Sequence, residues 1–192
     1  MRTTIAVDGN AATQPLFEQA LLHISRSYRT AFSAQTTMRP SRLVITTARS
    51  GEVACATSIR CSGEAFFSQQ YLDTPVELLL SHRTGLDVAP EAILEVGTLA
   101  CNTPFAVYPT LQAVFRWGRD RGITWGLFTA TAEVRRLILR AKITPLMLGR
   151  AEAARVENPD QWGDYYQHDP WVCAFRDPAQ ATQPVAPRAE TA

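Results

Sequence analysis

The sequence predicts an α+β fold in which one mixed, mostly antiparallel β-sheet is covered by helices. An amphipathic helix comes first, two β-branched strands joined by a tight turn follow it, and the second half alternates strand and helix. The chain has 192 residues, 46% hydrophobic and 19% charged, which fits one globular domain. We expect this domain over residues 14–176, a flexible N-terminus over residues 1–13, and a disordered Pro/Ala-rich tail over residues 177–192.

The first predicted elements are a helix and a β-hairpin. Pro15 stands at the start of a run whose apolar residues recur at i, i+4 spacing, which predicts an amphipathic helix over residues 15–32. Residues 42–48 and 52–61 are β-branched runs joined by an Arg-Ser-Gly turn at residues 49–51. This pattern is typical of two antiparallel strands.

The middle of the chain predicts short helices followed by a distorted strand. Residues 66–85 indicate one or two short helices, with Thr74 as a candidate N-cap and Gly85 as the stop. Residues 92–101 form an apolar run with one acid, and Gly97 in its middle indicates a β-bulge.

The second half predicts alternating elements that complete the sheet. In order, they are a helix over residues 110–122, a strand over 124–131, a helix over 132–142, a short extended segment over 145–149, and an aromatic, β-like segment over 162–177 that closes the sheet.

The composition excludes several classes of function. Nineteen Lys and Arg residues against 18 Asp and Glu leave a net charge of +1, which does not favour nucleic acid or an anionic membrane as a partner. The four cysteines include no CxxC pair, so no metal site is expected. Residues 1–10 lack the pattern of a signal peptide, and no apolar run is long enough to insert in a membrane. We expect a cytoplasmic protein with reduced thiols.

Four motifs occur in an order that resembles one known family. They are FSQQYLDTPVE at residues 67–77, ILEVGTLA at 93–100, TWGLFTAT at 124–131, and WGDYY followed by PWV between 162 and 172. Together they resemble the thermostable hemolysin family. The resemblance implies a GNAT-like acyltransferase fold, distantly similar to acyl-homoserine-lactone synthases, which place a glutamate on the strand before the long helix.

Two positions depart from the pattern of that family. Thr98 stands where the family usually has asparagine, which affects a polar contact beside the bulge. Pro90 and Glu91 stand where an arginine commonly precedes the strand, which alters the entrance of the strand.

The resemblance implies a binding site for the acyl donor between two splayed parallel strands. In such a site, the backbone of the bulged strand binds the pantetheine arm, and one N–H group faces the thioester carbonyl. An ordinary core strand weakened by glycine is the alternative interpretation. The residues implied are Val96, Gly97, Thr98, Leu99 and Ala100 on one strand and Phe128 and Thr129 on the other.

The segment after the bulged strand bears on the choice of donor. Coenzyme A users commonly have a glycine-rich loop there, whose N–H groups bind the pyrophosphate at a helix N-terminus. Here the segment is CNTPFAVYPTLQ, with no glycine and with Pro104 and Pro109. We therefore expect an acyl thioester on the phosphopantetheine of an acyl carrier protein in preference to acyl-coenzyme A, and no tightly bound cofactor.

Three residues are candidate catalytic groups. Glu95 is an acid in an apolar run, so it is either a general base for the attacking amine or a structural carboxylate paired with an arginine such as Arg29 or Arg60. Cys101 is a nucleophile, a proton donor to the leaving thiolate, or a small buried cysteine. Tyr108 is a general acid or a packing residue at the helix end.

Further residues are candidates for contacts with the acceptor. In the segment YLDTPVE, Asp73 is interpreted as a helix cap, and Glu77 is interpreted as a functional residue on the acceptor side of the site. Trp162, Tyr165 and Tyr166 are interpreted as packing at the end of the sheet. The candidate substrate-binding residues are Arg29, Tyr71, Glu77, Trp125 and Thr131.

The sequence therefore predicts an N-acyltransferase that joins an acyl thioester to the amine of a small molecule, in specialised metabolism. Two alternatives stay open: a membrane-active hemolysin, and a ligand-binding member of the fold without activity. The sequence leaves the oligomeric state open.

Overall fold

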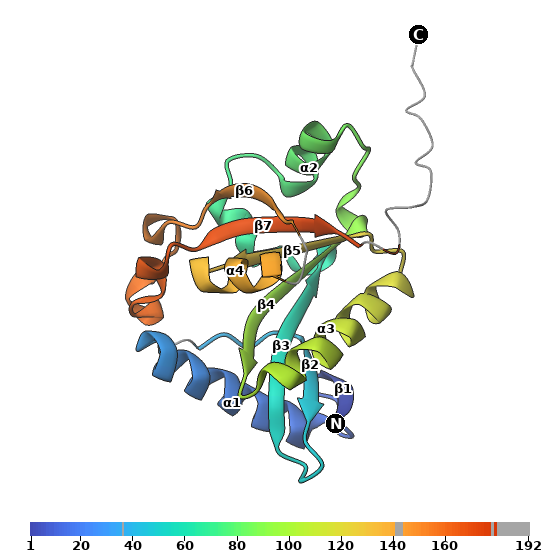
Figure 1. The fold of residues 1–192 in the computed structure, drawn as a ribbon, viewed down its shortest axis with the longest axis vertical. Coiled ribbons are helices and arrows are strands. Elements are labelled where there is room, and N and C mark those ends of the chain that lie inside the picture. The colour runs from blue at the N-terminus through green and yellow to red at the C-terminus, as the bar shows by residue number, and fades with distance from the viewer. Residues whose placement is uncertain (36, 141–143, 178, 180–192) are drawn as a thin grey trace.

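A seven-stranded sheet with the strand order β1-β2-β3-β4-β5-β7-β6 forms the centre of the computed structural model, which describes residues 1–35, 37–140, 144–177 and 179 (Figure 1). Only β4 and β5 pair in parallel among these strands, and every other neighbouring pair is antiparallel. The predicted fold class is confirmed. The strands are β1 Arg2–Val7, β2 Arg42–Thr47, β3 Val53–Cys61, β4 Ile93–Cys101, β5 Trp125–Ala130, β6 Leu146–Arg150 and β7 Trp171–Arg176.

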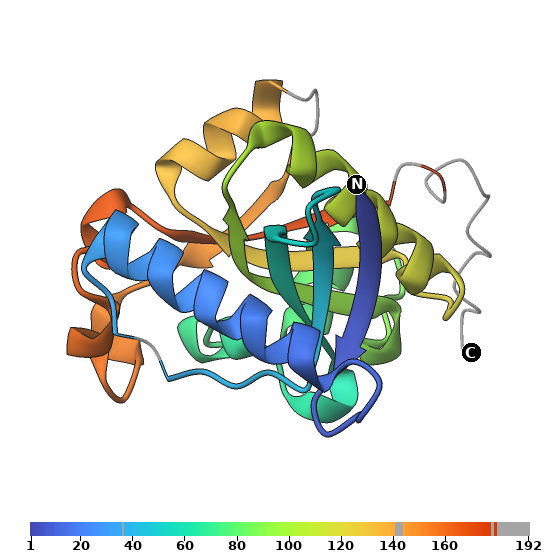
Figure 2. The ribbon, with the colours of Figure 1, turned by 90° about the horizontal axis from the view of Figure 1, so that it is seen from below.

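The helices cover both faces of the sheet. Helix α1 packs its buried side chains on one face of β2 and β3, while α3 packs on the opposite face of β2 and β4. Helix α4 lies over β5 and β7, on the same side as α3 (Figure 2). The bounds are α1 Gln14–Phe32, α2 Val76–Thr84, α3 Pro104–Arg119 and α4 Ala132–Arg140.

The N-terminus differs from the prediction. Residues 1–13 were expected to be flexible, but β1 pairs with β2 from Arg2↔Thr47 to Val7↔Arg42. Ala6 is fully buried there against the α1 side of the core. A short run such as RTTIAV carries a weak strand signal by itself, and pairing with β2 supplies the missing hydrogen bonds. The predicted disordered tail lies, apart from Asp177 and Ala179, outside the described residues.

Helix starts also differ from the prediction. Helix α2 begins after Pro75 and not after a Thr74 cap, and the side chain of Gln69 accepts a hydrogen bond from the N–H of Val76. Gly85 ends α2 in the left-handed conformation, as expected. Helix α3 begins at Pro104, separated from β4 by two residues, so residues 104–109 of the segment interpreted as a loop belong to a helix.

The aromatic segment near the C-terminus contains less strand than expected. Only β7 is extended, and it lies between β5 and β6, so β6 forms this edge of the sheet. Residues 159–168 instead form two short 3-10 helices, η5 Pro159–Trp162 and η6 Tyr165–His168. Another 3-10 helix, η2 Phe67–Tyr71, lies in the region predicted as short helices. The end of the predicted helix over 132–142 falls at residues 141 and 142, outside the described residues.

Candidate active site

Strand β4 carries the predicted bulge one residue after the glycine that signalled it. Ser58 pairs with Gly97 and Ala56 pairs with Ala100, so two residues of β4 face the single residue Thr57 of β3. Thr98, one of these two, has a φ of 47° in the left-handed region. This conformation is unusual for a β-branched residue and costs about 1–3 kcal/mol.

Replacing Thr98 should therefore stabilise the protein. Thr98→Asn removes the β-branch, which clashes most in the left-handed region, and keeps a polar side chain near the hydroxyl of Ser58, to which Thr98 Oγ1 donates at 3.0 Å. We expect the free energy of unfolding to rise by about 1 kcal/mol. Urea unfolding of both proteins measures it. Thr98→Val, which keeps the branch and loses the hydroxyl, should be less stable than the wild type. If Thr98→Asn is no more stable than Thr98→Val, the backbone of Thr98 is not strained.

Beyond the bulge, β4 separates from β5. The parallel pairing runs from Ile93↔Trp125 to Val96↔Phe128 and stops there, although β4 continues to Cys101 and β5 to Ala130 (Figure 1). Backbone groups on the facing edges of the two strands thus lack ladder partners in one another past Val96 and Phe128. This gap lies at the position predicted for the donor arm.

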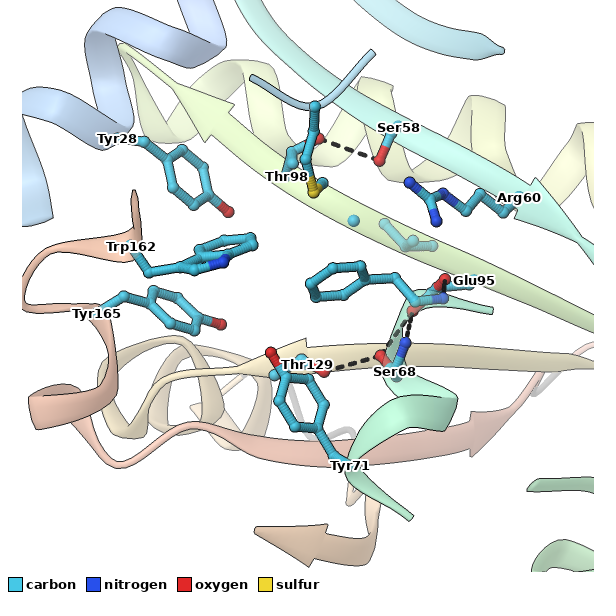
Figure 3. Close-up of a pocket in the computed structure, with 14 residues that line it drawn as sticks. Tyr28, Ser58, Arg60, Ser68, Tyr71, Glu95, Thr98, Thr129, Trp162 and Tyr165 are labelled. Carbon is cyan, nitrogen blue, oxygen red and sulfur yellow. Dashed lines mark hydrogen bonds between the residues drawn. The ribbon is translucent and has the colours of Figure 1, made fainter. Parts of the chain in front are cut away.

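A pocket lies beside this gap, on the face of the sheet that carries Glu95. It encloses about 450 Å³ of space, its open mouth included, and β3, β4, β5, α1, η2, η5 and η6 all contribute to its wall (Figure 3). Its lining consists of Tyr28, Met38, Ser58, Arg60, Phe67, Ser68, Tyr71, Glu95, Val96, Gly97, Thr98, Thr129, Trp162 and Tyr165.

Glu95 anchors η2 to the sheet. Its side chain is 3% exposed, and its two oxygens accept hydrogen bonds from the N–H of Phe67 at 2.6 Å and from the N–H and hydroxyl of Ser68 at 2.7 and 2.6 Å. Burial raises the pKa of the Glu95 carboxyl above its usual range, while these hydrogen bonds and the charge of Arg60 oppose the rise. Neither Arg29 nor Arg60 forms an ion pair with Glu95, so the alternative of a carboxylate paired with one of these arginines does not hold.

A hydrogen-bonded chain connects this carboxylate to the gap between the strands. The Ser68 hydroxyl lies 2.6 Å from Glu95 Oε1 and 2.8 Å from Thr129 Oγ1 (Figure 3). Because an ionised carboxylate only accepts, Ser68 donates its one hydroxyl hydrogen to Glu95, and Thr129 must donate to Ser68. The lone pairs of the Thr129 hydroxyl are then free to accept a hydrogen from a ligand in the pocket.

Some predicted site residues come together in this pocket. Glu95, Val96, Gly97, Thr98, Thr129 and Tyr71 line it. The Tyr71 hydroxyl hydrogen-bonds to that of Tyr166 at 2.8 Å. Phe128 closes the inner end of the gap, whereas Leu99 packs against β3 and α3, and the carbonyl of Ala100 accepts a hydrogen bond from His23 Nε2 at 3.1 Å.

Other predicted residues lie elsewhere. Tyr108 is 70% exposed on α3 and accepts a hydrogen bond from Gln112, and Arg29 is exposed on α1. Glu77, on α2, does not line the pocket, and Trp125 is buried in the core below it. The hydroxyl of Thr131 lies 3.5 Å from the N–H of Val134 at the start of α4. Asp73 forms an ion pair with Arg155 and caps no helix.

Cys101 is the clearest correction among the catalytic candidates. It lies opposite Cys55 across β3 and β4, and the two form a disulfide. A cysteine bonded in this way carries no free thiolate, so Cys101 is neither the nucleophile nor the proton donor, and the expected reduced state is wrong for this pair. Adjacent strands bring the two residues together although 46 positions separate them in sequence.

Cys101→Ser should consequently reduce stability and leave the chemistry intact. For a 46-residue separation, the chain-entropy model gives about 4 kcal/mol of stabilisation from the disulfide. We expect that loss in urea unfolding, with catalytic turnover at 25 °C within about threefold of the wild type. Reductant should destabilise the wild type to the same degree and leave the variant unchanged. A variant that is stable but has lost its turnover would restore a chemical role for the thiol.

Most residues of the pocket wall were not predicted as site residues from the sequence. Trp162 and Tyr165 were interpreted as packing at the sheet end, and Arg60 only as an ion-pair partner. Tyr28, Ser58 and Ser68 carried no signal beyond ordinary helix and strand positions. The motif order offered the one usable hint, because FSQQYLD and WGDYY both lie in the family pattern and both contribute to this wall.

Neither a metal centre nor a membrane helix is found in the described part of the chain. No group of three or more His, Cys, Asp or Glu side chains is arranged to hold a metal ion there. The same residues include no helix that is both long and apolar enough to cross a bilayer.

Solved structures share this fold at low sequence identity. FeeM, an N-acyl amino acid synthase from uncultured soil microbes, superposes with a TM-score of 0.58 at 11% identity, covering 90% of this chain and 94% of its own. BjaI, a coenzyme A-dependent acyl-homoserine lactone synthase, gives 0.56 at 12% identity, covering 90% and 81%. An agmatine N-acetyltransferase mutant gives 0.52 at 14% identity, covering 91% and 99%. The predicted GNAT-like fold is confirmed.

The family follows from the sequence itself. The model of the thermostable hemolysin family matches residues 11–180, so the chain belongs to that family. No curated protein sequence matches the chain.

Proposed function

We propose that this protein is an N-acyltransferase that transfers an acyl group from a thioester to the amine of a small molecule in specialised metabolism. One observation carries the proposal: the β4–β5 ladder ends at Val96 and Phe128, and the chain Thr129–Ser68–Glu95 begins at that opening. An open strand edge supplies hydrogen-bond donors for the thioester carbonyl, and a buried carboxylate supplies a base.

The reaction needs one bond formed and one broken. The amine nitrogen attacks the thioester carbonyl held in the gap, a C–N bond forms, and the C–S bond breaks as the pantetheine sulfur leaves. N–H groups on the β5-facing edge of β4 stabilise the oxyanion that develops on the carbonyl. The donor arm lies between residues 97–100 of β4 and residues 129–130 of β5, beyond the last ladder pair of Val96 with Phe128, so the expected stretch is shorter at its inner end.

Proton transfer follows the hydroxyl chain. The attacking nitrogen gives a proton to Thr129 Oγ1, Thr129 passes its own hydrogen to Ser68, and Ser68 passes its hydrogen to Glu95 Oε1. The raised pKa of Glu95 makes its carboxylate a stronger base than an exposed glutamate. The proton then returns to the leaving thiolate, so the cycle consumes no other acid or base.

An acyl carrier protein is the donor partner that we favour over coenzyme A. Helix α3 is separated from the end of β4 by two residues and starts with Pro104, which has no N–H, and no glycine occurs among residues 101–109. Few backbone N–H groups of this segment can therefore bind the pyrophosphate of coenzyme A. The phosphopantetheine of a carrier protein has a single phosphate, which needs fewer such hydrogen bonds. Among the structural neighbours, BjaI is described as coenzyme A-dependent, so the shared fold is also compatible with coenzyme A as the donor.

The test compares both donors on the intact protein. Octanoyl thioesters of coenzyme A and of an acyl carrier protein are incubated with a panel of amines and amino acids, and intact-mass measurement follows the loss of the acyl group and the formation of the amide. We expect amide formation, with a kcat/KM at least tenfold higher for the carrier thioester. Absence of transfer from either donor overturns the proposal, and faster transfer from coenzyme A overturns the carrier preference alone.

The pH dependence should show opposite trends for activity and stability. The folded-state pKa of Glu95 lies above its ordinary 4.5, so the folded protein holds this proton more tightly than the unfolded chain. The stability that this group contributes is therefore complete below pH 4.5 and is lost as the pH rises through the folded-state pKa. Over the same window kcat/KM should rise, because Glu95 ionises. Unfolding and kinetics from pH 4.5 upward measure both. The contribution of Glu95 should be absent in Glu95→Gln, so the stability of the wild type relative to this variant should fall as the pH rises. A wild-type stability that rises relative to the variant, in parallel with kcat/KM, would contradict the role of Glu95.

A further inference from the structure

Four polar groups of the pocket have no hydrogen bond or ion pair with any residue that the structure describes. They are the Arg60 guanidinium, the Trp162 indole N–H, and the hydroxyls of Tyr28 and Tyr165 (Figure 3). Trp162 and Tyr165 are only 9% and 6% exposed. The polar atoms of these four residues are therefore open to the pocket, where a polar ligand can form hydrogen bonds with them.

Arg60 offers the positive charge for this ligand. It lies directly opposite Glu95 in the β3–β4 register, on the same face of the sheet, and its guanidinium carbon lies 5.8 Å from the centre of the Phe67 ring. The oxygens of Glu95 already accept hydrogen bonds from η2, which leaves the guanidinium free. A half-buried guanidinium without a counter-ion is suited to bind a carboxylate with two hydrogen bonds.

Aromatic rings form the opposite wall. Trp162 lies 5.4 Å from Tyr165 and 6.4 Å from Tyr28, measured between ring centres, and Tyr28 stacks on Tyr165 at 6.4 Å. Phe67 lies 5.5 Å from Trp162 and extends the wall toward Arg60. Such a wall favours a planar ring, and the free N–H and O–H groups on it favour a ring that carries a polar substituent.

We propose that the acyl acceptor is an α-amino acid with a planar aromatic side chain, such as tyrosine. Its carboxylate binds Arg60, and its ring lies against Tyr28, Trp162 and Tyr165. The two contacts fix the α-amino group between them, on the side of the pocket where Thr129 and the β4–β5 gap lie. This inference names the substrate class of the proposed acyltransferase and rests on that function.

Binding without a donor tests the inference separately from catalysis. Isothermal titration of the intact protein compares L-tyrosine, tyramine and L-alanine. We expect L-tyrosine to bind at least tenfold more tightly than tyramine, which lacks the carboxylate, and at least tenfold more tightly than L-alanine, which lacks the ring. Equal binding of tyrosine and tyramine overturns the role of Arg60, and equal binding of tyrosine and alanine overturns the role of the rings.

A variant pair locates the carboxylate contact. Arg60→Gln should weaken L-tyrosine binding 10- to 100-fold and change tyramine binding less than threefold. Arg49→Gln, an exposed arginine in the turn between β2 and β3, should change neither. Should Arg60→Gln fail to fold, Arg60→Lys must weaken tyrosine selectively, because an ammonium cannot form the two parallel hydrogen bonds. Equal weakening of both ligands overturns the inference.

The outcomes separate this inference from the proposed function. If amines are acylated from a thioester but amino acids do not bind, the acyltransferase stands and the aromatic amino acid acceptor is wrong. If L-tyrosine binds through Arg60 and neither thioester donates to it, the binding site stands and the acyltransferase is wrong.

Discussion

Glu95→Gln should lower the single-turnover rate of acyl transfer by about two to four powers of ten. The carboxylate is the proton acceptor at the end of the chain through Ser68 and Thr129, and an amide cannot take that proton. The amide has nearly the same shape, so the variant should still fold. The measurement is rapid-quench single turnover with the thioester and amine that support wild-type transfer.

The same variant should also lose stability, because Glu95 accepts from three donors. An amide nitrogen must replace one oxygen and would meet the N–H of Phe67 or of Ser68, which leaves a donor facing a donor. We expect about 1.5–3 kcal/mol of destabilisation, the usual contribution of hydrogen bonds to a charged group. The rate is therefore compared at a temperature where both proteins are fully folded. Glu64→Gln, which weakens an ion pair with Arg42 outside the pocket, serves as the matched control.

A near-normal rate in a folded Glu95→Gln protein would refute the catalytic assignment. The role of Glu95 would then be structural only, as the hydrogen-bond acceptor that anchors η2. In that case the loss would appear only in unfolding experiments, and the rate per folded molecule would equal that of Glu64→Gln.

The sequence predicted the sheet well where local patterns agree with tertiary contacts. The hairpin β2–β3, the bulged strand β4 and the following strand β5 each combine β-branched or apolar residues with a turn or glycine signal. Strand β1 was missed because its order depends on pairing with β2, 35 or more positions away along the chain. The start of α3 was missed because Pro104 and Pro109 suggested a loop, although proline at the first helical position favours a helix.

The site was predictable only in part, for a physical reason. Glu95 could be selected because a lone acid in an apolar run must be stabilised by something. Its actual partners include backbone N–H groups of η2, which almost any residue type can supply, so no side-chain pattern in the sequence predicts them. Likewise, Trp162 and Tyr165 join the pocket because two 3-10 helices follow one another where a strand was expected.

Thr129→Val should reduce turnover about as strongly as Glu95→Gln, by two to four powers of ten, and with little loss of stability. Valine has the shape of threonine and fits a strand, but it removes the hydroxyl between the amine and Ser68. Ser68 keeps its hydrogen bond to Glu95, so the anchor of η2 stays in place. The expected result is a folded protein with an unchanged unfolding midpoint and a slow chemical step.

This contrast separates proton transfer from anchoring, which Glu95→Gln alone cannot do because Glu95 serves in both. Thr129→Ser, which retains the hydroxyl, should recover most of the rate, whereas Thr47→Val makes the same change on β2, far from the pocket, and should leave it unaltered. If Thr129→Val turns over at the wild-type rate while Glu95→Gln does not, the amine must lose its proton by a path that bypasses the hydroxyls. Glu95 would then have to accept it through Oε2, which receives one hydrogen bond, from Phe67, and keeps one lone pair free.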